Sequence, residues 1–203
     1  MAIVINGSTN VISGVAVGGL PDGIVDTDML AANAVTAAKS SGLATTNGIT
    51  MADLWRVTTD VSVSSGYNYL TANWERCDTG GFGQIGTGMT QSGGVFTFPS
   101  TGIYKLNFGI YARDDGSSST NGVHIHTTTD GGSNYTFCSN AYFNISNIST
   151  HTYGFGFVEF IFDVTDVSTH KARFVVYSAD SIVVEGNSNA NSTYATFTRL
   201  GDT

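Results

Sequence analysis

The strongest constraint on the fold is a two-residue alternation of apolar and polar side chains in the last three quarters of the chain. It is clearest at residues 104–110 and 158–164, where aromatic or aliphatic residues occupy every second position. Successive side chains of a β-strand point to opposite faces, so the pattern predicts strands with one face in a core. Turn-forming residues bound such runs at 114–116, 130–132 and 185–187. These features predict an all-β sandwich.

Composition supports many short strands joined by turns. Charged residues make up 12% of the chain, about half the usual share in globular proteins. Glycine is abundant, with 25 residues, which suits turns better than long solvated helices. We expect about eight to ten strands, at residues 54–61, 67–76, 82–87, 94–98, 102–113, 122–129, 134–143, 153–165, 171–184 (as one strand or as two) and 192–200.

The chain divides by composition into residues 1–52 and 53–203. All 23 aromatic residues lie in the second part, beginning with Trp55. A segment of about 50 residues without aromatic side chains has little material for a core of its own. We therefore expect an extended N-terminal arm (1–52) that orders only against a partner, followed by a globular knob domain (53–203).

Short apolar pieces in the arm are the candidates for docking onto other proteins. A solvated linker has no need of them, because low hydrophobicity keeps linkers disordered. An N-cap at Thr27 or Asp26 and helical spacing of apolar residues predict one short helix near 26–39. The candidate docking residues are Ile3, Val4, Ile5, Val15, Val17, Met29 and Leu30.

Charge and hydropathy argue against two classes of partner. The net charge is −8, and Lys and Arg form no cluster of the kind that binds phosphates, so we expect no nucleic-acid binding. The apolar runs are far shorter than the ~20 residues that span a bilayer, so we expect no membrane insertion. Cys77 and Cys138 lack a CxxC spacing. Two unpaired thiols are the first interpretation, and a disulfide is the alternative.

Few residues suggest chemistry, and we expect no enzyme and no cofactor. His124 and His126 lie two apart on an expected strand, so their side chains share a face and form a weak candidate for a metal site. Asp114 and Asp115 lie in a Ser-rich loop and are a weak candidate for calcium, with a solvated turn as the simpler interpretation. The sequence contains no G-x-S-x-G, phosphate-loop or H-E-x-x-H motif.

Two segments resemble the complement globular-head and tumour-necrosis-factor family. Residues 94–108 (GVFTFPSTGIYKLNF) are similar to the family's F-T-x-P strand followed by G-x-Y and an alternating apolar strand. Residues 192–197 (STYATF) resemble its last strand, S-x-F-x-G-F, although Tyr194 replaces the first Phe and Thr196 replaces the Gly. The resemblance covers residues 53–203.

This resemblance implies a ten-strand jelly roll that forms a tight homotrimer around an aromatic-lined axis and binds partners. An ordinary monomeric sandwich is the alternative. The Tyr153, Phe155 and Phe157 row has two interpretations: it faces outward and is buried by a trimer, or a bulge at Gly156 turns it into the core. The candidate core and trimer residues are Phe96, Phe98, Tyr104, Leu106, Phe108, Tyr153, Phe155, Phe157, Phe160, Tyr194 and Phe197.

A second resemblance concerns residues 19–39 of the arm. Their L-A-x-N-A-V-T-x-A-K pattern is similar to shaft segments that precede the C-terminal tip of bacteriophage fibre proteins. It implies a protein that assembles in the host cytoplasm and is displayed on the virion surface, as a head fibre, a decoration protein or a short tail-fibre tip.

Together these features predict a non-enzymatic, trimeric adhesive appendage. The arm would dock on other virion proteins, and the loops at 114–121, 130–134 and 186–192 would contact a host-surface glycan or protein. A secreted bacterial binding module of the same fold is the alternative, although no signal peptide is visible. A polysaccharide-degrading spike is a third hypothesis.

Overall fold

The computed structural model describes residues 4–6, 11–13, 48–114, 116, 118–146, 148 and 152–203. The chain divides into two units, Met1–Asn47 and Gly48–Thr203. In the first unit, β1 (Val4–Asn6) pairs antiparallel with β2 (Val11–Ser13), with Ile5 opposite Ile12. The expected helix at 26–39 and the docking candidates Ile3, Val15, Val17, Met29 and Leu30 lie outside the described residues.

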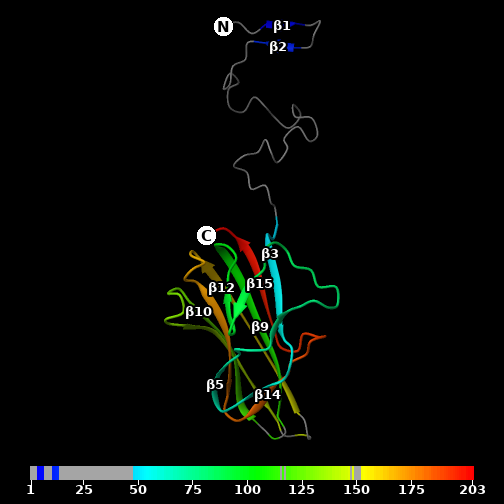
Figure 1. Cartoon of the computed structure of the whole chain (residues 1–203), viewed down its shortest axis with the longest axis vertical. Helices are drawn as coiled ribbons and strands as arrows, with labels where there is room; N and C mark the ends of the chain where they lie inside the picture. Colours follow the sequence, from blue (N-terminus) through cyan, green and yellow to red (C-terminus); the bar gives the residue numbers. More distant parts are fainter. Residues whose placement is uncertain are drawn as a thin grey trace. The chain divides into compact units, whose positions relative to one another are not determined.

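The second unit is an all-β sandwich of two sheets (Figure 1). The six-stranded sheet contains β5 (Gly66–Tyr69), β7 (Thr90–Ser92), β8 (Val95–Thr97), β10 (Ser118–Thr128), β11 (Thr136–Ile145) and β13 (Lys171–Ser178). The seven-stranded sheet contains β3 (Met51–Val57), β4 (Val61–Val63), β6 (Trp74–Arg76), β9 (Gly102–Asp114), β12 (Thr152–Val164), β14 (Ile182–Val184) and β15 (Tyr194–Gly201). The part of the chain that the structure describes contains no helix.

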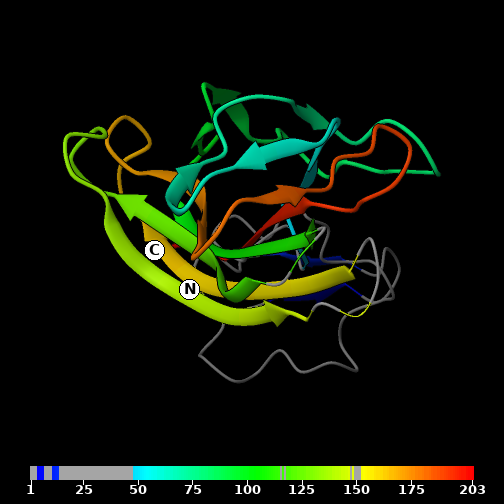
Figure 2. The ribbon, with the colours of Figure 1, turned by 90° about the horizontal axis from the view of Figure 1, so that it is seen from below.

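Strands distant in the sequence lie side by side in both sheets. In the six-stranded sheet, β10 pairs with one side of β13, and β8 and then β5 pair with the other side. In the seven-stranded sheet, β9 lies between β12 and the C-terminal strand β15. The end strands β11 and β12 belong to different sheets but lie next to each other, closing one side of the sandwich (Figure 2).

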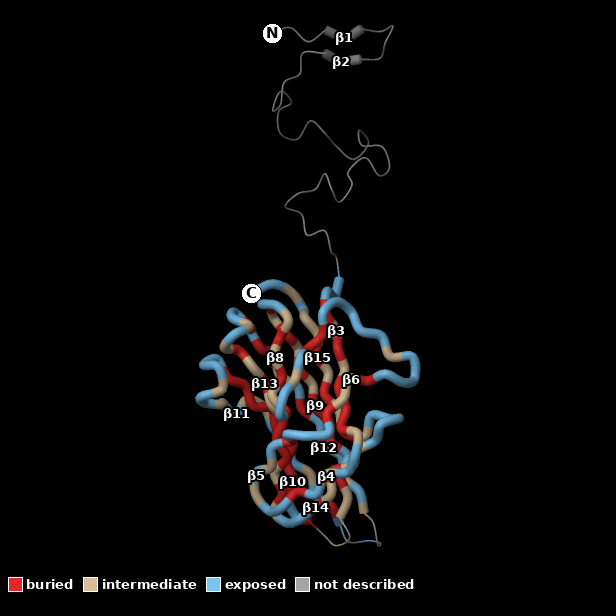
Figure 3. Tube along the Cα trace, in the orientation of Figure 1, coloured by how far each residue is buried: buried red, intermediate tan, exposed pale blue. Residues whose placement is uncertain are grey.

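Aromatic rings fill the space between the sheets. Phe96, Phe108, Phe174 and Phe197 are all completely buried, and Trp74 packs against three of them. The closest of these pairs, Phe108 and Phe174, has ring centroids 4.6 Å apart. Burial follows the strands through the middle of the unit, while the connecting loops are exposed (Figure 3).

The structure confirms an all-β jelly roll but contains 13 strands in its two sheets rather than ten. Two of the expected segments, 54–61 and 67–76, each comprise parts of two strands, and of the two alternatives for 171–184 the structure has the two strands β13 and β14. Between β5 and β6, for example, Asn73 adopts a positive φ of 63°, which interrupts the extended backbone. The expected strand at 82–87 was wrong. There the backbone makes only an isolated bridge between Ile85 and Ala52, and the strand of this region is β7.

Candidate functional site

The first candidate is an aromatic row on the outer face of the seven-stranded sheet. Tyr153, Phe155 and Phe157 of β12 are 45%, 51% and 40% exposed. The pairing of β12 with β9 runs without interruption from Thr152 to Val164. No bulge at Gly156 turns the row inward, so in the single chain the row faces outward.

Rings from neighbouring strands extend this row. Phe155 lies opposite Tyr111 of β9, and Phe157 lies opposite Gly109. A Cβ atom at Gly109 would lie 3.3–3.4 Å from the rings of Phe155, Tyr194 and Phe157, so these rings surround the glycine. We call the resulting surface the β9–β12 aromatic face; it consists of Tyr111, Tyr153, Phe155, Phe157 and Tyr194.

Glycines on the inward side of β12 explain why its large side chains all point outward at this end. A Cβ atom at Gly154 would lie 2.6 Å from the ring of Phe143, and one at Gly156 would lie 2.8 Å from Val123. The inner sheet surface is therefore filled by side chains of β11 and β10. Further along β12, Val158 and Phe162 point inward and are buried, while Phe160 is half-buried.

Most of the other residues that the sequence predicts for the core or the trimer interface lie in the interior. Tyr194 is half-buried and belongs to the β9–β12 aromatic face. The buried members are Phe96, Phe98, Tyr104, Leu106, Phe108 and Phe197. The alternation of residues 102–113 thus separates an inward series from outward residues such as Tyr111, which sequence analysis did not single out.

The proposed metal pair, His124 and His126, lies on the outer face of the six-stranded sheet. Both side chains are buried, and their ring centroids lie 6.1 Å apart. Burial, and secondarily the neighbouring His126, lowers the pKa of His124 to about 4, so the ring is neutral at pH 7. Burial and then the charge of Arg173 also lower the pKa of His126. No His, Cys, Asp or Glu among the described residues joins them in a group of three metal ligands.

The candidate calcium loop is only partly described. Asp114 ends β9 and accepts a hydrogen bond from the backbone N–H of Gly116, whereas Asp115 lies outside the described residues. In the next loop, the carboxylate of Asp130 accepts hydrogen bonds from Asn134 and Thr128, which lower its pKa. These contacts stabilise turns.

Two of the three expected contact loops are true connections. Residues 130–134 and 186–192 lie between strands. Residues 118–121 instead begin β10, so most of the expected loop at 114–121 was wrong. Cys77 and Cys138 are both free thiols, so the disulfide alternative was wrong.

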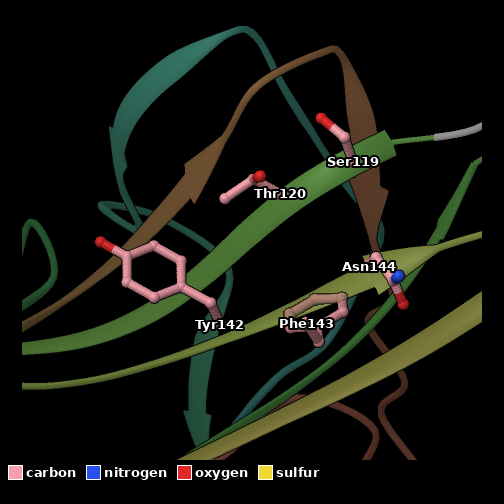
Figure 4. A pocket seen from close by; sticks show the side chains of 5 residues that line it. All are labelled: Ser119, Thr120, Tyr142, Phe143 and Asn144. Carbon is pink, nitrogen blue, oxygen red and sulfur yellow. The ribbon is translucent and has the colours of Figure 1, made fainter.

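Sequence analysis did not identify a second outward aromatic surface, on the six-stranded sheet. Tyr67 and Tyr69 of β5 and Phe137 and Tyr142 of β11 are each about half exposed. Beside Tyr142 lies a hollow of about 370 Å³, which Ser119, Thr120, Phe143 and Asn144 also line (Figure 4). The alternation Tyr67-Asn68-Tyr69 and the pair of histidines are the sequence signals that could have indicated this surface.

No helix among the described residues is long and apolar enough to cross a membrane. No protein-family model matches the sequence, and no curated protein matches it.

Solved structures, in contrast, share the fold. The crystal structure of murine APRIL at pH 5.0 matches 74% of this chain and 99% of its own, with 14% identity and a TM-score of 0.51. The structure of Eiger TNF from S. frugiperda matches 75% of this chain and 94% of its own, with 15% identity and a TM-score of 0.56. At such low identity the likeness shows the fold alone: this chain contains a tumour-necrosis-factor-like jelly roll.

Proposed function

We propose that this chain is a non-enzymatic adhesive protein that forms a homotrimer through its β9–β12 aromatic face and is carried on the surface of a bacteriophage particle. The observation that carries the proposal is the outward row of Tyr153, Phe155 and Phe157 on one strand. The particle location is supported by the arm, whose residues 19–39 resemble phage shaft segments.

Self-association follows from the cost of exposing this row to water. Burial of apolar area stabilises by about 25 cal/mol per Å², and aromatic residues contribute most of the energy of protein interfaces. The row is contiguous and fixed on a paired strand, so its burial requires no rearrangement of the backbone. The number of copies, three, comes from the family that the sequence resembles.

Light scattering on the full chain tests the assembly. We expect a mass of about three chains that persists on dilution to micromolar concentration, because burial of the aromatic row favours the assembled state. A stable monomer at that concentration would contradict the proposal.

The particle role needs a separate test. Deletion of residues 2–23 removes β1 and β2, and we expect it to abolish incorporation into particles while the assembly in solution still contains three chains. Electron microscopy of the particle would locate the protein directly. Full occupancy by the truncated protein would mean that the arm is not the anchor.

A catalytic spike is the competing function on the same fold. Incubation of the trimer with host capsule polysaccharide would separate the two, since an adhesive protein leaves the chain length of the polysaccharide unchanged. Shortened polysaccharide would contradict the non-enzymatic assignment.

A further inference from the structure

The six-stranded sheet has an unusual charge distribution for a chain of this composition. The protein contains 16 acidic residues against 8 Lys and Arg and has a net charge of −8. None of the strands β5, β7, β8, β10, β11 and β13 contains an Asp or a Glu. The outer face of this sheet is therefore free of strand carboxylates in an otherwise acidic protein.

Two basic residues on this face form no ion pair with any described residue. Of the seven Lys and Arg in the described part of the chain, Arg56, Arg76, Lys105, Arg113 and Arg199 each form an ion pair. The other two are Lys171 and Arg173, two residues apart on β13 and therefore on the same face. The Lys171 amine donates a hydrogen bond to a neutral hydroxyl, Oγ1 of Thr97, at 3.5 Å.

Aromatic rings hold the guanidinium of Arg173 in place. Its Cζ lies 4.1 Å from the ring centroid of Tyr69 and 3.7 Å from that of Tyr135. Cation–π contacts stabilise this position, and the planar guanidinium of arginine is suited to bidentate binding of carboxylates. Its Nε is buried without a hydrogen-bond partner among the residues that the structure describes. Arg173 is thus held against two rings and forms no ion pair with a described residue.

Exposed rings lie beside Arg173 and over the two neighbouring histidines. Tyr67, Tyr69, Phe137 and Tyr142 are 57%, 47%, 46% and 53% exposed. Beneath them, His124 meets the rings of Tyr67, Phe137 and Tyr142 edge-on, with centroids 4.8–5.6 Å apart. Their positions are therefore supported from below. We call Tyr67, Tyr69, Phe137, Tyr142, Lys171 and Arg173 the β5–β13 face.

We propose that the β5–β13 face binds an acidic oligosaccharide, with sugar rings lying on the tyrosines and a sugar carboxylate paired with Arg173 and Lys171. The apolar faces of sugar rings stack on aromatic side chains, while the hollow beside Tyr142 offers hydroxyl and amide groups for sugar hydroxyls. The inference names the ligand class for the adhesive role in the proposed function and rests on it.

Charge and position favour this ligand over other partners. A nucleic acid presents a phosphate at every nucleotide and requires a longer series of cations than two. The β5–β13 face also lies on the opposite sheet from the β9–β12 aromatic face, so trimer formation through the latter leaves it available to a ligand.

Binding of the full chain to immobilised bacterial polysaccharides tests the inference. The panel contains polymers with uronic or sialic acid, neutral polymers of similar length, and single-stranded oligothymidylate. We expect binding to acidic polymers, and a rise in Kd of about tenfold or more in Arg173→Gln and in Tyr69→Ser, because each removes a main contact. Lys105→Gln is the matched control, since Lys105 lies on the other sheet and pairs with Glu159.

Thermal unfolding and light scattering are measured for each variant, to show that it folds and assembles like the unmodified protein. If Arg173→Gln fails to fold, Lys171→Gln provides the same comparison without removing a stacked side chain. Absence of binding to every acidic polymer, equal binding by the folded charge variants, or tighter binding to oligothymidylate would overturn the inference. A trimer that binds no glycan contradicts only this inference, whereas a monomer that binds acidic glycans contradicts only the proposed assembly.

Discussion

Tyr153 of β12 stacks on Tyr111 of β9, with ring centroids 5.0 Å apart and ring planes within 8° of parallel. Both rings lie at the surface, and Phe155 and Phe157 continue the row along β12. The stacked pair fixes both rings on the paired strands. A second molecule that buries this face therefore meets side chains that are already in place.

Replacing two rings of this row tests the interface. In Phe155→Ser/Phe157→Ser, we expect the mass in sedimentation equilibrium to fall from about three chains to one, because hot-spot side chains in an interface each contribute about 2 kcal/mol or more. The folded monomer should remain, since both side chains point away from the core. The matched control is Tyr67→Ser, an equally exposed aromatic on the other sheet, which should leave the mass unchanged.

A methyl group at Gly156 should destabilise the domain. The new Cβ would lie 2.8 Å from Val123 and 2.9 Å from the ring of Phe143, both closer than normal contact. We expect Gly156→Ala to lower the free energy of unfolding by about 1–3 kcal/mol through overpacking. Gly83→Ala is the control, because nothing lies within 4 Å of that position. Equal urea midpoints for the two variants would contradict the inward placement of Gly156.

A buried carboxylate joins β3, β6 and the chain before β7. Asp53, whose side chain is completely buried, pairs with Arg76 and accepts hydrogen bonds from Trp55 Nε1 at 2.9 Å and from the Met89 backbone N–H at 2.8 Å. Asp53→Ala leaves these donors without their acceptor, so we expect a loss of about 3–5 kcal/mol in chemical denaturation.

The exposed ion pair of Arg199 and Asp202 is the control for this effect. Asp202 is 92% exposed, and its replacement by Ala should change stability by less than about 0.5 kcal/mol. Similar losses for both variants would mean that the Asp53 network contributes no more than a surface pair.

The alternation of apolar residues was sufficient to predict the sandwich, because successive side chains of a strand point to opposite faces of the sheet. The inward series of β9 illustrates this, with Tyr104, Leu106 and Phe108 all buried. The alternation alone could not show whether the row that begins at Tyr153 faces inward or outward. That depended on the register with β9 and on Phe143 filling the space above the glycines, and both are long-range contacts.

The β5–β13 face was missed for a similar reason. Tyr69 and Arg173 are about a hundred positions apart in the sequence and become neighbours only because β5 pairs with β13, where Tyr69 lies opposite Val175. The sequence of each of the six strands lacks Asp and Glu. A face without carboxylates could not be inferred from this until the strand pairing showed that the six strands form one sheet.

The buried imidazole of His124 should make stability depend on pH. Its pKa is lowered from 6.5 to about 4 in the folded protein, chiefly by burial. Between these values the unfolded chain binds a proton that the folded chain does not, so the free energy of unfolding falls as pH falls, by about 1.4 kcal/mol for each pH unit. Below about pH 4 the folded imidazole also protonates and this contribution to the slope ends. His126, whose pKa is lowered in the same direction, adds to the effect.

Comparison with His124→Leu isolates this contribution. A change in packing shifts stability by the same amount at every pH, whereas loss of the imidazole removes the pH-dependent part. The stability of the variant relative to the unmodified protein should therefore increase steadily as the pH is lowered from 6.5 to 4 in urea titrations. The carboxylates with lowered pKa, Asp130 and Asp166, titrate below their ordinary value of 3.8 and lie outside this window. A stability difference that stays constant across the window would show that His124 titrates normally and that the rings of Tyr67 and Tyr142 do not keep it from water.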